Sequence, residues 1–139
     1  MKHSLIAFLS ILGFMYCQGQ SNDLNIKFDT IQINLNERLL FKVGVDSSDH
    51  LTFSKVNGFI DSTTIMSIEL TYNGAAGTIL KLNNPFSKEI VYKAELYSHK
   101  KKKFLETSTV PIFPGISSYE TWPYKIDTIQ LSGFKLQDP

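Results

Sequence analysis

The stretch IVYKAEL, residues 90–96, decides the fold class of this chain. Its apolar residues Ile90, Tyr92, Ala94 and Leu96 alternate with polar or smaller neighbours along most of its length. Successive side chains of a β-strand point to opposite faces, so this alternation predicts a strand with one dry and one wet side. Such a strand is typical of an antiparallel sheet that covers a core on one face only.

The same alternation recurs along the chain, at residues 39–45, 66–72, 80–82 and 129–131. Residues 24–39 also place apolar side chains at helical spacings, but Thr30, Asn34 and Asn36 are poor residues for a helix interior. We therefore predict two short strands there, over residues 24–28 and 30–35, or one bent strand.

Turn residues punctuate these strands at short intervals. The turns are predicted at residues 46–49, 57–58, 73–77, 83–85 and 100–103, and a long ordered loop is predicted at residues 111–123, before a last strand near residues 127–136. About seven or eight strands with such turns predict an antiparallel β-sandwich. Its expected core contains Phe41, Val43, Ile68, Leu70, Leu82, Ile90, Tyr92, Leu96 and Leu131.

Residues 79–96, ILKLNNPFSKEIVYKAEL, resemble the middle of immunoglobulin-like domains of the kind that includes chaperone-like and major-sperm-protein-like sandwiches. In those domains an apolar strand ends in an Asn-rich turn, and the next strand carries alternating aromatic residues. The resemblance implies an all-β, immunoglobulin-like β-sandwich and carries no functional residue across.

The N-terminal residues predict export. A short basic start, Met1 to His3, precedes the apolar run SLIAFLSILGFMY, which matches a secretory signal. Such a run rises about 20 Å as a helix, too little for a hydrocarbon core of about 30 Å, so no transmembrane span is predicted after signal removal. We predict a signal peptide over residues 1–19 and one β-sandwich domain over residues 20–139. The new N-terminus, Gln20, is similar to that of exported proteins of the Bacteroidota.

Cys17 raises a second interpretation, a lipid anchor, because a Cys at the end of an apolar run is the acceptor in bacterial lipoproteins. Met15 and Tyr16 argue against it, because the lipoprotein pattern has a small residue just before the Cys. The predicted location is periplasmic or extracellular, or the cell surface if Cys17 is lipidated.

Composition and motifs exclude several functions. The net charge of +1 offers no large field to hold nucleic acid. The two His residues after the signal, His50 and His99, are far apart, and Asp46, Asp49 and Asp61 do not follow a calcium-loop pattern. No nucleophile motif is present. We expect a chain that is not an enzyme and has no cofactor or metal.

Two groups are candidate contact residues. The aromatic residues Tyr119, Trp122 and Tyr124 could stack on sugars or anchor a partner, although Trp122 could instead plug one end of the sandwich. The second group, here called the lysine tip, consists of Lys100, Lys101, Lys102 and Lys103. It could contact acidic lipid headgroups, lipopolysaccharide phosphates or acidic glycans, or it could be a solvated hairpin tip that opposes aggregation.

The leading hypothesis is an exported, non-enzymatic module that binds a protein or glycan partner through loops, above all residues 111–124. The alternative is a structural component of a cell-surface assembly that pairs through a sheet edge. A small secreted hydrolase is the third hypothesis.

Overall fold

The computed structural model describes residues 29–56 and 64–138. The predicted signal peptide, Cys17, the predicted strand at residues 24–28, the turn at residues 57–58 and Asp61 lie outside the described residues. In the described part of the chain, no helix has the length and apolar composition needed to cross a membrane.

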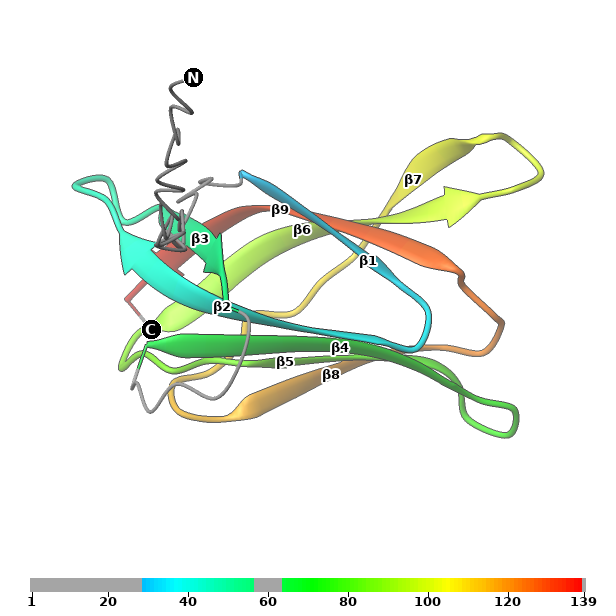
Figure 1. The fold of residues 1–139 in the computed structure, drawn as a ribbon, viewed down its shortest axis with the longest axis horizontal. Helices are drawn as coiled ribbons and strands as arrows, with labels where there is room; N and C mark the ends of the chain where they lie inside the picture. Colours follow the sequence, from blue (N-terminus) through cyan, green and yellow to red (C-terminus); the bar gives the residue numbers. More distant parts are fainter. Residues whose placement is uncertain (1–28, 57–63, 139) are drawn as a thin grey trace, which may run out of the picture.

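The described residues form nine strands in two antiparallel sheets (Figure 1). The strands are β1 (Thr30–Asn34), β2 (Glu37–Val45), β3 (Leu51–Lys55), β4 (Ile65–Asn73), β5 (Gly77–Asn83), β6 (Glu89–Ser98), β7 (Lys103–Thr107), β8 (Ser117–Trp122) and β9 (Thr128–Gln137). The four-stranded sheet has the order β1-β9-β6-β7, and the five-stranded sheet has the order β3-β2-β4-β5-β8. The predicted all-β sandwich is confirmed, with one or two strands more than expected.

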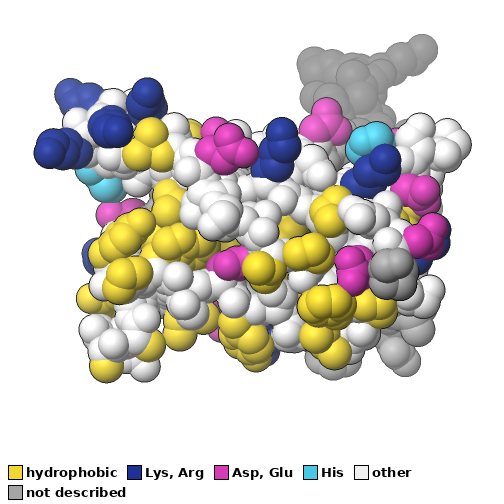
Figure 2. All heavy atoms as spheres, turned by 180° about the vertical axis from the view of Figure 1, so that it is seen from behind, with side chains coloured by type: hydrophobic (Ala, Val, Ile, Leu, Met, Phe, Trp, Pro, Cys, Tyr) yellow, Lys and Arg dark blue, Asp and Glu magenta, His cyan; other side chains and the backbone are white. Residues whose placement is uncertain are grey.

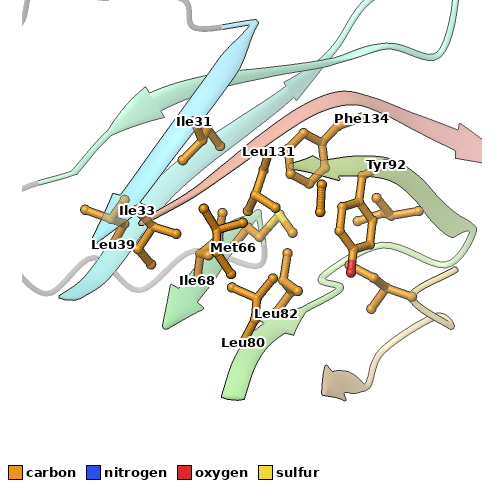
Figure 3. Close-up of a cluster of buried hydrophobic side chains, with 14 of the residues drawn as sticks. Ile31, Ile33, Leu39, Met66, Ile68, Leu80, Leu82, Tyr92, Leu131 and Phe134 are labelled. Atoms are coloured by element: carbon orange, nitrogen blue, oxygen red, sulfur yellow. The ribbon is translucent and has the colours of Figure 1, made fainter. Parts of the chain in front are cut away.

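The core lies between the two sheets, where the inward side chains of both sheets meet (Figure 3); β7 contributes no buried residue to it. In β4, for example, Met66, Ile68 and Leu70 are fully buried, while their neighbours are only half-buried. Every predicted core residue is buried except Leu96, which is partly buried and packs against the core. The alternation therefore predicted the inward face correctly for these core residues of β2, β4, β5, β6 and β9, whereas β3 and β7 were not predicted as strands.

The prediction of a long loop at residues 111–123 was wrong, because this segment contains strand β8. All three of its prolines, Pro111, Pro114 and Pro123, lie outside the strand, where their missing N–H costs no ladder hydrogen bond. Within the strand, Tyr, Thr and Trp favour extended backbone, and every residue of β8 pairs with β5.

Two turns show what holds the strand ends in place. Gly77, with φ of +82°, ends the turn between β4 and β5, and a Cβ there would collide with the backbone carbonyl oxygen of Trp122. Only glycine fits this close approach of β5 to β8. In the turn between β2 and β3, Asp46 Oδ1 accepts hydrogen bonds from the backbone N–H groups of Ser48 and His50, at 2.8 and 3.0 Å.

Candidate ligand-binding cleft

The hairpin of β6 and β7 carries the lysine tip at one end of the sandwich (Figures 1 and 2). Its strands pair Leu96 with Leu105 and Tyr97 with Phe104. Because neighbouring positions face opposite sides, the two leucines share one face of the hairpin and the two aromatic rings share the other. The ring centroids of Tyr97 and Phe104 lie 5.3 Å apart.

The connection between β8 and β9, residues 123–127, lies at the same end of the molecule and is joined to the hairpin. His99 Nε2 lies 3.0 Å from Asp127 Oδ2, and Lys125 Nζ lies 3.3 Å from Asp127 Oδ1. The donated hydrogen bonds from Lys125 and, more weakly, His99 lower the pKa of Asp127 below its ordinary value. Asp127 thus links the hairpin to the connection.

A buried hydroxyl braces this connection from the five-stranded sheet. Thr78 Oγ1 donates to the backbone carbonyl of Tyr124 at 2.8 Å and accepts from the backbone N–H of Ile126 at 2.9 Å. Thr78 is fully buried, whereas the side chain of Tyr124 is 56% exposed. The backbone around Tyr124 is therefore fixed while its ring faces solvent.

A cleft of about 480 Å³ separates the hairpin from the connection. The cleft is lined by apolar, hydroxyl-bearing and ionisable residues, namely Leu96, Leu105 and Ile126, then Tyr97, Ser98, Thr107 and Tyr124, then His99, Lys100, Glu106 and Lys125. Its volume falls in the range of about 300–1,000 Å³ that is typical of small-ligand sites. Several polar groups converging on an apolar patch can fix the orientation of a small ligand.

The structure brings together part of each predicted contact group. Lys100 and Tyr124 both line the cleft, and the other three lysines continue the hairpin beside it. Tyr119 does not line it, because this residue projects outward from β8 and is 57% exposed. Lys81 Nζ lies 5.6 Å from the centroid of the Tyr119 ring.

Trp122 takes the structural position that the sequence offered as its alternative. It is 8% exposed and belongs to the core, on the opposite face of β8 from Tyr119. Tyr119 and Tyr124 are both exposed, as expected, but Trp122 is not available as a surface anchor between them.

Glu120 holds the start of the segment that crosses from β7 to β8. Its Oε1 atom accepts a hydrogen bond from the backbone N–H of Val110 at 2.9 Å and from the Tyr92 hydroxyl at 3.3 Å. Burial, reinforced by the nearby carboxylate, raises the pKa of Tyr92, so this hydroxyl remains a donor. Glu120, Asp127 and Thr78 were not predicted from the sequence, because each has a partner far away along the chain.

Two further observations concern metal binding and a second hollow. Within residues 29–56 and 64–138, no three side chains of His, Cys, Asp or Glu come together in a way that could hold a metal ion. A second hollow, of about 300 Å³, lies between β1 and β2 and is lined by Ile31, Leu39, Phe41 and the charged residues Glu37 and Lys55, among others. It contains none of the predicted contact residues.

Comparison of the chain with protein-family models, with curated proteins and with solved structures finds no match. The resemblance to immunoglobulin-like domains therefore stays a prediction.

Proposed function

We propose that this chain is an exported, non-catalytic binding module whose ligand site is the cleft between the β6–β7 hairpin and the β8–β9 connection. The observation that carries the proposal is that Tyr124 and Lys100, which belong to two separately predicted contact groups, line the same cleft. The sequence-based hypothesis placed the site on the whole loop at residues 111–124. The site proposed here uses only the C-terminal end of that loop, together with the β6–β7 hairpin.

The geometry of the cleft favours binding with a small loss of conformational entropy. Tyr124 offers a large exposed ring, and its backbone is held by the buried hydroxyl of Thr78. The hairpin is held through His99 and Asp127. An exposed aromatic side chain on a braced backbone loses little freedom when a partner covers it.

The test compares Tyr124→Ala with Tyr72→Ala, because Tyr72 is 42% exposed on β4 and lies outside the cleft lining. We expect Tyr124→Ala to lose retention on an array of neutral and acidic glycans and to keep its melting temperature. Tyr72→Ala should retain the same glycans as the wild type. Equal retention by all three proteins would overturn the proposal, as would a Tyr124→Ala variant that melts lower and still binds.

Sheet-edge assembly remains a second candidate, and one observation favours it. Strand β8 is the edge of the five-stranded sheet, and its outward residues Ser117, Tyr119 and Thr121 carry no charge. Proteins commonly protect such edges with lysine, proline or a bulge. By contrast, the edge strand β7 begins with Lys103 and the edge strand β3 ends with Lys55.

A lysine placed on β8 tests this candidate. Thr121→Lys should abolish assembly that proceeds through β8, whereas Gln32→Lys on the edge strand β1 should leave it intact. Light scattering of the purified protein over a range of concentrations measures the assembly. A wild type that stays monomeric at every concentration would rule out self-assembly through this edge.

A further inference from the structure

The lysine tip brings four positively charged side chains together at the end of one hairpin. Among the described residues, none of the four lysines takes part in an ion pair. The sequence places Glu95 and Glu106 near the tip, but these two residues face each other across β6 and β7. Glu95 Oε2 instead accepts a hydrogen bond from Gln130 at 3.4 Å. The tip is thus a concentrated cationic surface beside the cleft.

Within the tip, Lys102 has a backbone conformation that glycine adopts more easily. Three described residues other than glycine have positive φ, namely Asn36, Asp49 and Lys102. Asn and Asp tolerate this left-handed conformation, but a lysine at φ of +52° has no such advantage over glycine. A long charged side chain at a position with positive φ makes Lys102 a residue whose role the substitutions below can test.

We infer that the cleft and the lysine tip together bind an acidic glycan, a sugar chain that carries carboxylate or phosphate groups. This inference rests on the proposed function and names its ligand class. A sugar ring packs on the exposed face of Tyr124, and its hydroxyl groups form hydrogen bonds with Ser98 and Thr107 in the cleft. The acidic groups of the same chain lie against Lys100 and the following lysines.

The composition of the cleft favours a glycan over other polyanions. A flat anionic membrane would contact the protruding lysines and leave the cleft, with its hydroxyl groups and Tyr124, unoccupied. Ser98 and Thr107 lie on the same face of the hairpin as Leu96 and Leu105, so their hydroxyl groups can exchange hydrogen bonds with the hydroxyl groups of a sugar ring in the cleft. Lys125 already pairs with Asp127, so the tip lysines are the cations that remain for the ligand.

The first experiment measures binding of the wild-type protein to oligogalacturonate by calorimetry, with the fully methyl-esterified oligosaccharide as the matched neutral probe. The two probes share the sugar ring and differ in charge. We expect the acidic probe to bind at least about tenfold more tightly, and this advantage to shrink between about 0.05 M and about 0.5 M salt, because salt screens exposed charges.

The second experiment separates the tip from charge in general. Replacement of all four tip lysines by glutamine should weaken oligogalacturonate binding by about tenfold or more. The control replaces Lys42, Lys55, Lys93 and Lys135 by glutamine, which removes the same charge from exposed positions elsewhere. Equal losses from both variants would overturn the inference, because they would show a general charge effect.

The remaining arms distinguish failure of this inference from failure of the proposed function. If Tyr124→Ala abolishes retention of a neutral glycan and the acidic probe does not bind, the cleft is a site and the acidic ligand class is wrong. If oligogalacturonate binding is unaffected by Tyr124→Ala, or if vesicles of anionic phospholipid or poly-glutamate bind more tightly than the sugar, the acidic glycan is excluded as the ligand of the cleft. Loss of oligogalacturonate binding in both the Tyr124 and the lysine variants, with melting temperatures unchanged, supports it.

Discussion

The two halves of strand β6 follow one alternating sequence pattern but differ in how deeply their inward side chains are buried. In the first half, Ile90 and Ala94 are fully buried and Tyr92 is nearly so. In the second half, Leu96, Tyr97 and Ser98 are only partly buried and line the cleft. Both halves have strands beside them, so pairing within the sheet does not explain the difference.

The difference comes from what lies opposite the inward face. The first half is covered by the other sheet, as the hydrogen bond from Tyr92 to Glu120 on β8 shows. The second half diverges with β7 from the five-stranded sheet (Figure 1), and its inward face meets the cleft and the β8–β9 connection. Alternation sets the direction of a side chain, and an opposing layer is needed to bury it.

The largest test of this comparison truncates one apolar residue in each half of β6. Ile90→Ala should lower the free energy of unfolding by about 2–5 kcal/mol, because it leaves a cavity in a closed core. Leu96→Ala should cost less than about 1.5 kcal/mol, because solvent already reaches this side chain. Urea denaturation measures both values. Lys93→Ala, on the exposed face between them, should change stability by less than about 0.5 kcal/mol.

The next test removes the polar anchor of the first half. Asn84 is 2% exposed, and its Nδ2 donates to the backbone carbonyls of Lys88 and Ile112, each at 2.8 Å. Its Oδ1 accepts from the backbone N–H of Phe86 at 2.8 Å. Asn84→Ala should cost about 3 kcal/mol in urea denaturation, because it removes three hydrogen bonds of a nearly buried side chain, although the Ile112 carbonyl keeps its bond from the Ile90 N–H.

Asn73→Ala is the control for that test. Asn73 caps an exposed turn, where its Oδ1 accepts one hydrogen bond from Ala75 at 3.2 Å. Water can replace this bond, so we expect a loss below about 1 kcal/mol. Equal losses at Asn84 and Asn73 would show that Asn84 does not anchor the crossing segment.

The sequence predicted the elements of this fold whose signal is local. The alternation of Ile90, Tyr92 and Ala94, or of Ile68 and Leu70, reports the inward face directly, because each residue carries its own preference for burial. Hairpin turns such as that at Lys100 are also local, since the residues that form them are adjacent.

Features that depend on distant contacts were not predicted. The alternation does not indicate that Leu96 is only partly covered, because this depends on how the β6–β7 hairpin diverges from the five-stranded sheet. Strand β8 was predicted as part of a loop because prolines flank it. Its extended conformation depends on pairing with β5, which the sequence does not reveal. The candidate cleft was half predicted: Tyr124 and Lys100 were recognised by type, but their meeting depends on His99 and Asp127, which are 28 residues apart.

A smaller loss of stability is expected from Thr78, the residue that braces the β8–β9 connection opposite the second half of β6. Thr78→Val keeps the shape of the side chain and removes its hydroxyl, so the backbone groups of Tyr124 and Ile126 lose their partner. We expect a cost of about 1–2 kcal/mol and weaker binding at the cleft. Thr78→Ser, which keeps the hydroxyl, should restore most of both. Loss of stability without any change in glycan retention would show that the connection does not shape the site.

The smallest effect concerns Asp127, the exposed carboxylate that joins the hairpin to the connection. Its pKa is lowered first by the hydrogen bond from Lys125 and then by that from His99, so Lys125→Gln should raise this pKa more than His99→Gln does. A carboxyl group whose pKa is lowered on folding stabilises the folded state above the unfolded pKa. That contribution is lost as the pH falls below about 4 and through the lowered value.

Carboxyl ¹³C shifts recorded during an acid titration measure the pKa of Asp127. The pKa of Asp46, which is lowered mainly by backbone donors in the β2–β3 turn, should stay unchanged in both variants. If the two substitutions moved the pKa of Asp127 equally little, the hairpin would not be held by this carboxylate, and the second half of β6 would depend on its pairing with β7 and β9 alone.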